Sequence, residues 1–187
     1  MRKNFGARAL SYPMAVYLVT TYNPDGTANT MNAAWGGVSN DHEFTLCLSA
    51  DHKTVKNLQR TGAFTISIGD GRHVVECDYV GLASGNKVAN KVQQAGFTVS
   101  KSTLVNAPMI NELSVCIECT VINYNPETCV LVGDIVNVSV DESALTDGKV
   151  DIQKVLPLIY DPFNHTYHLV GAKVGNAFSD GKQLLGK

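Results

Sequence analysis

The sequence predicts a mainly β protein, an antiparallel barrel with a short helical block inserted among its strands. About seven or eight segments show period-two alternation or a short continuous apolar run, both typical of strands. Consecutive segments are joined by hairpin-type turns, such as Asn23–Gly26 and Asn125–Thr128. Helical spacing is confined to Thr54–Gly62 and to two segments between the fourth and fifth strands. With 187 residues, 44% of them hydrophobic, the chain suffices for one domain, residues 1–187.

The amino-terminal part is expected to form three strands. Tyr12–Tyr22 leads into the turn Asn23–Gly26, whose proline and glycine supply the turn dihedral angles. Thr27–Ser39 returns as the partner strand, and Phe44–Ser49 alternates so that one face is apolar. The pair Gly36-Gly37 indicates a bulge or a place where something approaches the backbone closely.

The next segment, Thr54–Gly62, is expected to be a helix with Asp51 as its N-cap, ending at Gly62. Its apolar side chains, Val55 and Leu58, are expected to face inward. The residues expected to face outward are Lys56, Asn57, Gln59 and Arg60. The elements expected next are a short strand, Ala63–Ile68, and two short helices, Val74–Ala83 and Val88–Ala95.

Two long strands, Glu112–Tyr124 and Cys129–Asp141, are expected to form a hairpin. A two-residue loop of Pro126 and Glu127 would place apolar residues opposite apolar residues. The pairs expected are Val121 with Val132, Ile117 with Val136 and Val115 with Val138. The same register places Cys119 opposite Asp134, which would then need a polar partner on the apolar face.

The carboxyl-terminal part begins with a polar stretch, Asp141–Asp151, that is expected to be a loop. Val155–Tyr160 is expected to be a last apolar strand, and Tyr167–Val170 is expected to pair again. The tail Gly171–Lys187 is expected to be loosely held.

Charge and hydropathy exclude several classes of partner. The formal charge of −2 and the pI near 6.2 give no polycationic surface for nucleic acid. No apolar run approaches the roughly 20 residues that a membrane span needs. The first 22 residues carry basic residues ahead of apolar ones, but Tyr12-Pro13 interrupts them and no small-residue cleavage site follows. We therefore expect a soluble cytoplasmic protein without a nucleic-acid or membrane partner.

The spacing of the five cysteines is typical of neither a disulfide framework nor a metal site. Cys116 and Cys119 are three residues apart in an alternating segment, so a regular strand would point their thiols to opposite faces. We expect reduced, structural thiols. The five histidines include no H-E-x-x-H, and no carboxylate-histidine cluster completes a metal set.

The segment Asn29–Asn40 holds the only tryptophan, Trp35, among residues too small or too polar for an ordinary core strand. Shortly after it, a strand end and a helix start bring together Ser49, His52, Lys53 and Thr54. Free amides and the helix dipole favour an anion there, and lysine and hydroxyl groups donate to phosphate oxygens. An aromatic ring beside an anion site suits a flat ring that carries a phosphate, so the hypothesis is a flavin site. The alternative for the second cluster is a capped helix with a solvated basic face.

These residues resemble a known family, the flavin reductase-like, FMN-binding split barrels, and its flavoredoxin-like branch above all. The resemblance covers about Tyr12 to Asp141. Its first part is carried by Thr21, Gly26, Asn29, Met31, Ala33, Ala34 and Trp35. Its second part is carried by Ser49, His52, Lys53, Thr54, Asn57, Gly62 and Phe64. The helical insertion contributes Cys77-Asp78-Tyr79, Ser84-Gly85, Lys91 and Gly96-Phe97.

The resemblance implies a Greek-key split barrel and a homodimer with FMN near the subunit interface. It implies that Met31, Ala33, Ala34 and Trp35 contact the flavin ring, and that Asn29 and Asn32 make polar contacts to the cofactor. Ser49, Lys53 and Thr54 would hold the phosphate with help from Lys91, and Phe163 would cover the ring. The other cofactor-site residues that it implies are His52, Asn57, Cys77, Asp78 and Ser84. No catalytic side chain is expected, because the electron transfer belongs to the flavin.

Three functions remain open at this point. The first is an NAD(P)H-dependent flavin reductase. The second is an FMN-bound electron carrier of the flavoredoxin type, or a reductase, that acts on a protein, a metal or a disulfide. The third, from another class, is a non-catalytic FMN-binding module. The sequence contains no nicotinamide fingerprint that would select the first.

Overall fold

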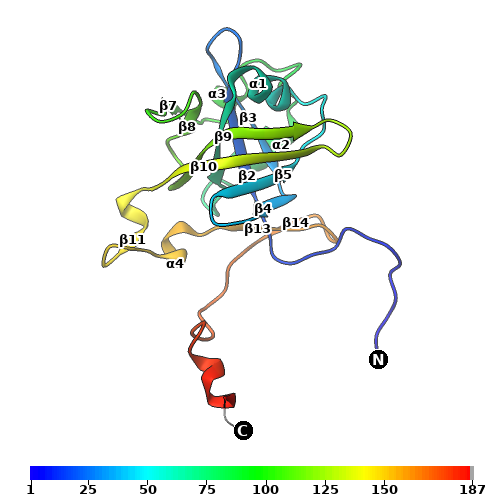
Figure 1. Cartoon of the computed structure of the whole chain (residues 1–187), viewed down its shortest axis with the longest axis vertical. Helices are drawn as coiled ribbons and strands as arrows, with labels where there is room; N and C mark the ends of the chain where they lie inside the picture. The colour runs from blue at the N-terminus through cyan, green and yellow to red at the C-terminus, as the bar shows by residue number, and fades with distance from the viewer. Residues whose placement is uncertain (186–187) are drawn as a thin grey trace.

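A computed structural model describes residues 1–185 and confirms the predicted fold class (Figure 1). Seven strands form one curled antiparallel sheet in the order β3-β2-β6-β9-β10-β5-β4. They are β2 (Tyr17–Tyr22), β3 (Ala28–Ala33), β4 (Gly36–Val38), β5 (Glu43–Cys47), β6 (Ala63–Ile68), β9 (Val115–Asn125) and β10 (Val130–Val140).

Smaller elements surround this sheet. A second sheet has the order β1-β13-β14, formed by Met14–Ala15, Leu158–Asp161 and Thr166–Leu169. The two ribbons are β7 (Val99–Lys101) with β8 (Pro108–Ile110), and β11 (Leu145–Thr146) with β12 (Lys149–Val150). The helices are α1 (Lys53–Thr61), α2 (Val74–Leu82), α3 (Lys91–Gln94), α4 (Ile152–Val155) and the 3-10 turns η1 (Glu142–Ala144) and η2 (Asp180–Leu184).

Two apolar clusters fill the interior. The first lies inside the curled sheet and contains Phe44, Leu46, Phe64 and Ile66, all at most 2% exposed. The second lies on the opposite side of β2 and joins it to α2 and to the 97–113 segment. Because β2 is covered on both sides, its four central residues, Leu18–Thr21, are all buried and none of them is charged.

Helix α1 begins one residue before the predicted start and ends as predicted. Gly62 adopts the left-handed conformation (φ 68°), and its amide donates to the Leu58 carbonyl at 2.8 Å. The predicted N-cap was wrong, because His52 occupies that position and no side chain caps the helix. The outward orientation expected for Asn57 was also wrong. This side chain is 2% exposed, and it donates to Thr21 Oγ1 at 3.2 Å and to Asn23 Oδ1 at 2.9 Å.

The predicted strand Thr27–Ser39 is broken in the middle. Strand β3 ends at Ala33, and the chain leaves the β2 edge to form β4 against β5 on the other edge of the sheet. A side chain at Gly36 would place its Cβ 2.5 Å from both Leu46 Cδ2 and the Thr45 carbonyl oxygen. The close approach expected at the glycine pair is thus found at Gly36. Trp35 stands at the crossing point, where its carbonyl accepts from the Cys47 amide at 2.9 Å.

The β9–β10 hairpin forms, but the predicted register was wrong. Residues 126–129 make a four-residue loop in which Cys129 has φ 60°, and the Asn125 side chain accepts from the Glu127 and Thr128 amides. Two irregularities follow, so Val121 lies opposite Gly133, Ile117 opposite Val138 and Val115 opposite Val140. Cys119 lies opposite Ile135, and Asp134 instead pairs with Thr120 on one side and with Glu43 on the other.

Three further boundaries differ from the sequence expectation. Val155–Tyr160 is divided, because α4 ends in a left-handed residue, Leu156 (φ 54°), before β13 begins. The polar stretch expected to be a loop contains η1 and the β11–β12 hairpin. Of the helix predicted over Val88–Ala95, only α3 forms. The pairing expected at Tyr167–Val170 is confirmed as β14.

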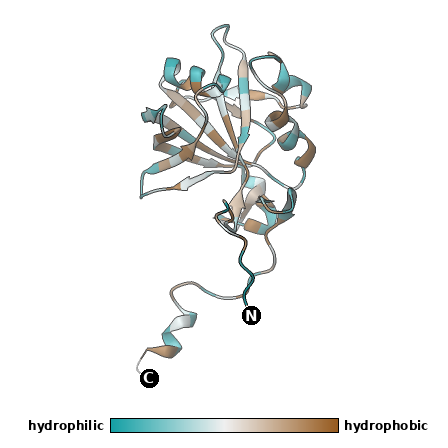
Figure 2. Cartoon of the chain, turned by 90° about the vertical axis from the view of Figure 1, so that its right-hand side faces the viewer, coloured by the Kyte–Doolittle hydropathy of each residue, from teal (hydrophilic) through white to brown (hydrophobic). Residues whose placement is uncertain are grey.

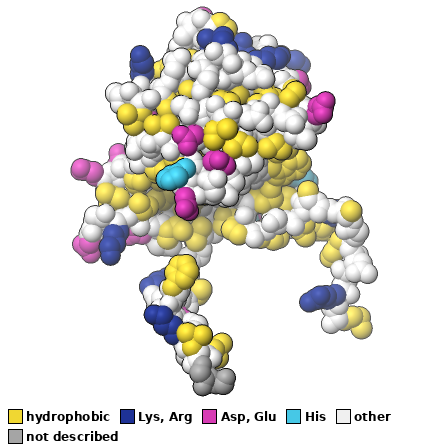
Figure 3. Space-filling view, viewed as in Figure 1, with side chains coloured by type: hydrophobic (Ala, Val, Ile, Leu, Met, Phe, Trp, Pro, Cys, Tyr) yellow, Lys and Arg dark blue, Asp and Glu magenta, His cyan; other side chains and the backbone are white. Residues whose placement is uncertain are grey.

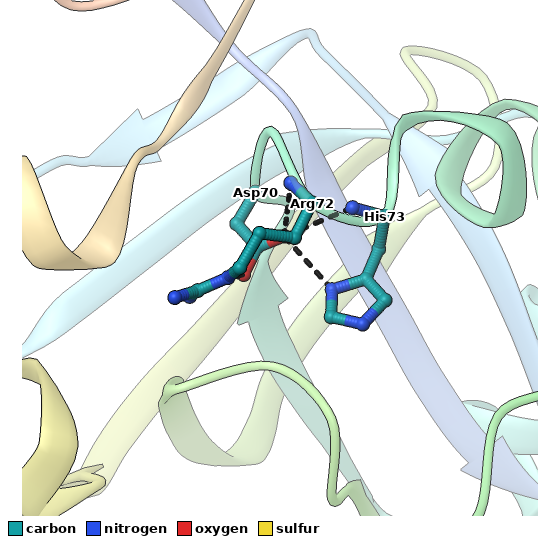
Figure 4. Close-up of polar contacts among 3 residues, drawn as sticks. All are labelled: Asp70, Arg72 and His73. Carbon is teal, nitrogen blue, oxygen red and sulfur yellow. Dashed lines mark hydrogen bonds and ion pairs between the residues drawn. The ribbon is translucent and has the colours of Figure 1, made fainter.

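A buried carboxylate fixes the start of α2 (Figure 4). Asp70 is fully buried and accepts from Arg72 Nε and Nη2 at 3.0 and 2.6 Å and from His73 Nδ1 at 2.8 Å. The amides of the same two residues donate to Asp70 Oδ1 at 3.0 and 3.1 Å. This network sets the direction in which α2 leaves β6, and the far end of α2 lines the site described below.

All five cysteines are free thiols. Burial raises the pKa of Cys77, Cys116 and Cys119 to about 12. The other two, Cys47 and Cys129, are exposed and half-buried.

Candidate functional site

Two adjoining cavities lie where β3, β5, α1 and α2 meet. The broad cavity has a volume of about 580 Å³ and the narrow cavity one of about 260 Å³. They share Met31, His52, Gly81 and Leu82, so they form one continuous groove. Volumes of roughly 300–1,000 Å³ are typical of small-molecule sites.

The broad cavity is built mainly from small, apolar and aromatic groups. Residues 31–35 form one wall, because β3 is an edge strand that pairs on one side only and the chain turns away from β2 after Ala33. Trp35 is 55% exposed and offers a flat ring surface. On the opposite side, α2 approaches β3 closely, since a Cβ at Gly81 would lie 3.0 Å from Asn32 Cβ. The Asn32 amide donates to the Cys77 carbonyl at 3.1 Å and joins the two walls.

Two tyrosines from the second sheet complete the broad cavity. Tyr167 Oη donates to Asp78 Oδ1 at 2.9 Å, and Tyr160 Oη lies 2.9 Å from His165 Nδ1. Burial, reinforced by the Asp78 carboxylate, raises the pKa of Tyr167 to about 12. Tyr167 therefore stays a neutral donor at physiological pH and locks the second sheet to α2.

The narrow cavity is polar and surrounds the start of α1. Asn29 Nδ2 donates to Thr54 Oγ1 at 2.8 Å, and both residues are at most 2% exposed. The 84–85 loop lies so close that a Cβ at Gly85 would be 2.1 Å from Asn29 Oδ1. His52 Nδ1 is buried here without a hydrogen-bond partner among the described residues. An uncapped helix start with an unsatisfied ring nitrogen beside it favours an anionic ligand with several acceptor oxygens.

Lys91 reaches the narrow cavity from α3 and is 3% exposed. Its ammonium donates to the carbonyls of Val80 and Ala83 at 2.9 and 2.7 Å. It thus satisfies carbonyls at the end of α2 and adds a positive charge beside the cavity. Burial lowers the pKa of Lys91 to about 8.

This lowered pKa predicts a pH dependence of stability. Between pH 8 and the ordinary lysine value of 10.5, the unfolded chain binds a proton at this site that the folded chain has lost. The free energy of unfolding of the wild type should therefore rise relative to that of Lys91→Met, by at most about 1.4 kcal/mol per pH unit. Urea unfolding of both proteins at pH 7.5, 8.5 and 9.5 measures the difference. A constant difference across this range would contradict the assignment.

Most of the predicted site residues converge on the groove. Those that line the broad cavity are Met31, Asn32, Ala33, Ala34, Trp35, Ser49, His52 and Asp78. Those that line the narrow cavity are Asn29, Met31, His52, Lys53, Thr54, Ser84 and Lys91.

Three predicted residues lie apart from the groove lining. Asn57 is engaged with Thr21 and Asn23, and the Cys77 side chain is packed in the second apolar cluster. Phe163 lines a neighbouring cavity of about 360 Å³, which shares Trp35, Tyr160 and His165 with the broad cavity.

Sequence reasoning missed several lining residues, namely Cys47, Leu48, Gly81, Leu82, Tyr160, His165 and Tyr167. The signal available for the last three was the cluster of aromatic and histidine side chains around the turn 161–165. Nothing in their spacing indicated that residues 160–167 line the same cavity as residues 31–35.

The curled antiparallel sheet and its groove define the class of small split-barrel proteins. Residues 9–168 match the family described as "Flavin reductase like domain", and the chain belongs to this family. Flavoredoxin of Desulfovibrio vulgaris (Miyazaki F) is 38% identical over 97% of this chain and 100% of its own, with a TM-score of 0.93. Flavoredoxin from Methanosarcina acetivorans is 29% identical over 99% and 98% of the two chains, with a TM-score of 0.85.

More distant relatives share the fold. An FMN-binding protein from Thermus thermophilus is 20% identical over 94% of this chain and 99% of its own, with a TM-score of 0.76. Within residues 1–185, no helix is both long and apolar enough to cross a membrane. The same residues contain no group of three or more histidine, cysteine or acidic side chains arranged to hold a metal ion.

Proposed function

We propose that this protein is an FMN-binding oxidoreductase of the flavoredoxin type, which carries electrons on a bound flavin for a redox partner protein. The observation that carries the proposal is the continuous groove, with a flat aromatic and apolar part joined to a polar part at a helix start. FMN has the same division, an isoalloxazine ring at one end and a phosphate at the other. The flavoredoxin likeness over nearly the whole of both chains supports the electron-transfer role.

The narrow cavity fits the phosphate end of FMN. Lys53 contributes a positive charge, and the amides of the first turn of α1 have no side-chain cap. Thr54 Oγ1 accepts from Asn29, so its own hydrogen is available to a phosphate oxygen. The buried His52 Nδ1 is an additional group that a polar ligand would satisfy.

The broad cavity fits the ring. The bound flavin supplies the redox chemistry, and the protein residues orient it and exclude water. Trp35 and Met31 offer an apolar face, while the side of β3 that does not pair with β2 would offer backbone groups to the ring edge. Asp78 is held by Tyr167 and is thereby kept in place on the α2 wall.

We also propose a homodimer in which the second subunit covers the groove. Trp35 is half exposed, and strands β3 and β4 are the two edges of the main sheet. Exposed edges and half-covered aromatic rings are commonly covered by a partner subunit. A two-fold axis would close two equivalent grooves at once.

Titration of the purified protein with FMN tests the cofactor assignment. One FMN should bind per chain and quench the fluorescence of Trp35, the only tryptophan. Anaerobic addition of NADH or NADPH, followed by flavin absorbance, then separates the candidate functions. Flavin that stays oxidised with both nucleotides, yet is reduced and reoxidised through a low-potential redox protein, is expected for a flavoredoxin-type carrier. Rapid bleaching by a nucleotide would instead establish a flavin reductase, and failure to bind FMN would refute the proposal.

A further inference from the structure

The tail, residues 171–185, exposes apolar side chains that a folded protein would normally bury. It leaves β14 and runs away from the barrel, on the same side as the amino-terminal arm (Figures 1 and 2). Its large apolar side chains are almost fully exposed, with Val174 at 102%, Phe178 at 98% and Leu185 at 79%. The hydrogen bond that ties it to the body joins Gln153 Nε2 to the Gly171 carbonyl at 3.1 Å. Apolar groups gathered on one short segment mark an interaction surface.

The tail, residues 171–185, carries a net positive charge. Lys173 and Lys182 take part in no ion pair within residues 1–185, and Asp180 is the one carboxylate of the segment. The Asp180 side chain accepts from the Asn176 amide at 2.8 Å and shapes the turn that leads into η2. The two ammonium groups flank Phe178, and Leu184 and Leu185 follow Lys182.

A patch of opposite charge lies on strands β5 and β10 and on the turn before β5. Asp134 and Glu43 are direct cross-strand partners, and like charges in that position repel each other. The Ile135 amide donates to the His42 carbonyl at 2.6 Å, which brings the turn containing Asp41 onto β10. None of the three carboxylates has an ion-pair partner among the described residues.

An apolar side chain borders these carboxylates, since Val136 is 43% exposed two residues after Asp134. Figure 3 shows acidic side chains gathered around a histidine on this face, with hydrophobic side chains beside them. We name Asp41, Glu43, Asp134 and Val136 the acidic patch.

We propose that the tail of one subunit docks on the acidic patch of a second copy of this chain. Phe178, Leu184 and Leu185 would cover Val136, while Lys173 and Lys182 would neutralise the repelling pair of carboxylates. The tail is directed away from its own barrel, so a second subunit on that side would lie within its reach, and a two-fold axis would make the two contacts equivalent. This inference rests on the proposed homodimer and is independent of FMN.

Photocrosslinking identifies what the tail contacts. Phe178→p-benzoylphenylalanine, irradiated in the purified full-length protein, should give a covalent dimer whose crosslinked peptide contains residues of the acidic patch. A product of monomer mass, crosslinked within one chain, would overturn the proposal. A covalent dimer crosslinked elsewhere on the partner would overturn the choice of the acidic patch.

Charge reversal supplies the second test. Lys182→Glu and Asp134→Lys should each raise the dimer dissociation constant by about tenfold or more, because each juxtaposes like charges. The double variant should restore most of the affinity. Lys101→Glu, which reverses an exposed charge on β7 outside the tail and the patch, is the matched control and should have no effect.

Sedimentation velocity separates failure of this inference from failure of the homodimer. A wild-type monomer at micromolar concentration would refute the proposed homodimer, and the docking with it. A wild-type dimer that is unchanged by Phe178→Ser and by both charge reversals would refute tail docking alone.

Discussion

Replacing both Lys53 and Thr54 by alanine should weaken FMN binding by about 2–5 kcal/mol, roughly 30-fold to several thousand-fold. Lys53 contributes a charge beside the narrow cavity, and Thr54 contributes a hydroxyl whose hydrogen is free. A phosphate placed there would lose one charge-assisted and one neutral hydrogen bond. Fluorescence titration of the apoprotein measures the change.

Riboflavin distinguishes a phosphate contact from a general loss of structure, because it has the ring and lacks the phosphate. It should bind the wild type and the double variant about equally. Thr54→Ser keeps the hydroxyl and should retain most of the FMN affinity. If the double variant binds FMN as well as the wild type does, the phosphate does not lie at the start of α1.

Asp70→Ala should lower the free energy of unfolding by about 2–4 kcal/mol. The substitution leaves two backbone amides and the His73 ring without their acceptor at a fully buried position. It also releases Arg72, whose half-exposed side chain can turn into water, so the loss stays below that of a fully buried ion pair. Urea unfolding followed by circular dichroism measures the effect.

Two comparisons locate the origin of this effect. Arg72→Gln should cost much less than Asp70→Ala, because the backbone amides and His73 keep their acceptor. Glu127→Ala removes an exposed carboxylate in the β9–β10 loop and should be neutral within about 0.5 kcal/mol. Equal losses in Asp70→Ala and Glu127→Ala would show that the buried network does not anchor α2.

The sequence predicted the architecture because its strands, turns and α1 are specified locally. Alternation of side chains and the glycine at position 62 suffice for these elements, and their bounds differ from the structure by a few residues. The hairpin register could not be predicted in this way. It depends on the left-handed backbone of Cys129 and on the two irregularities in the β9–β10 pairing, which no side-chain pattern in the sequence indicates.

The residues of the candidate site also differ in whether they could be predicted from local sequence. The residues expected at the groove from β3 and α1 lie close in sequence and are brought together by one strand and one helix. Tyr160 and Tyr167 reach the broad cavity through a separate sheet, so their contribution depends on tertiary packing. Asn57 lies close in sequence to the predicted site, but its orientation could not be predicted. As a polar residue of a helix it was expected to face solvent, whereas its side chain donates hydrogen bonds to the buried Thr21 hydroxyl and the Asn23 side-chain carbonyl.

The burial of three of the five thiols has a practical consequence for spectroscopy. A thiol whose pKa is about 12 forms almost no thiolate at neutral pH, and maleimides react with the thiolate. Covalent dyes would then attach at Cys47 and Cys129, the two accessible positions. Since Cys47 lines the broad cavity, bound ligand would shield it, leaving Cys129 as a single attachment point for a distance probe to Trp35 without any engineered cysteine.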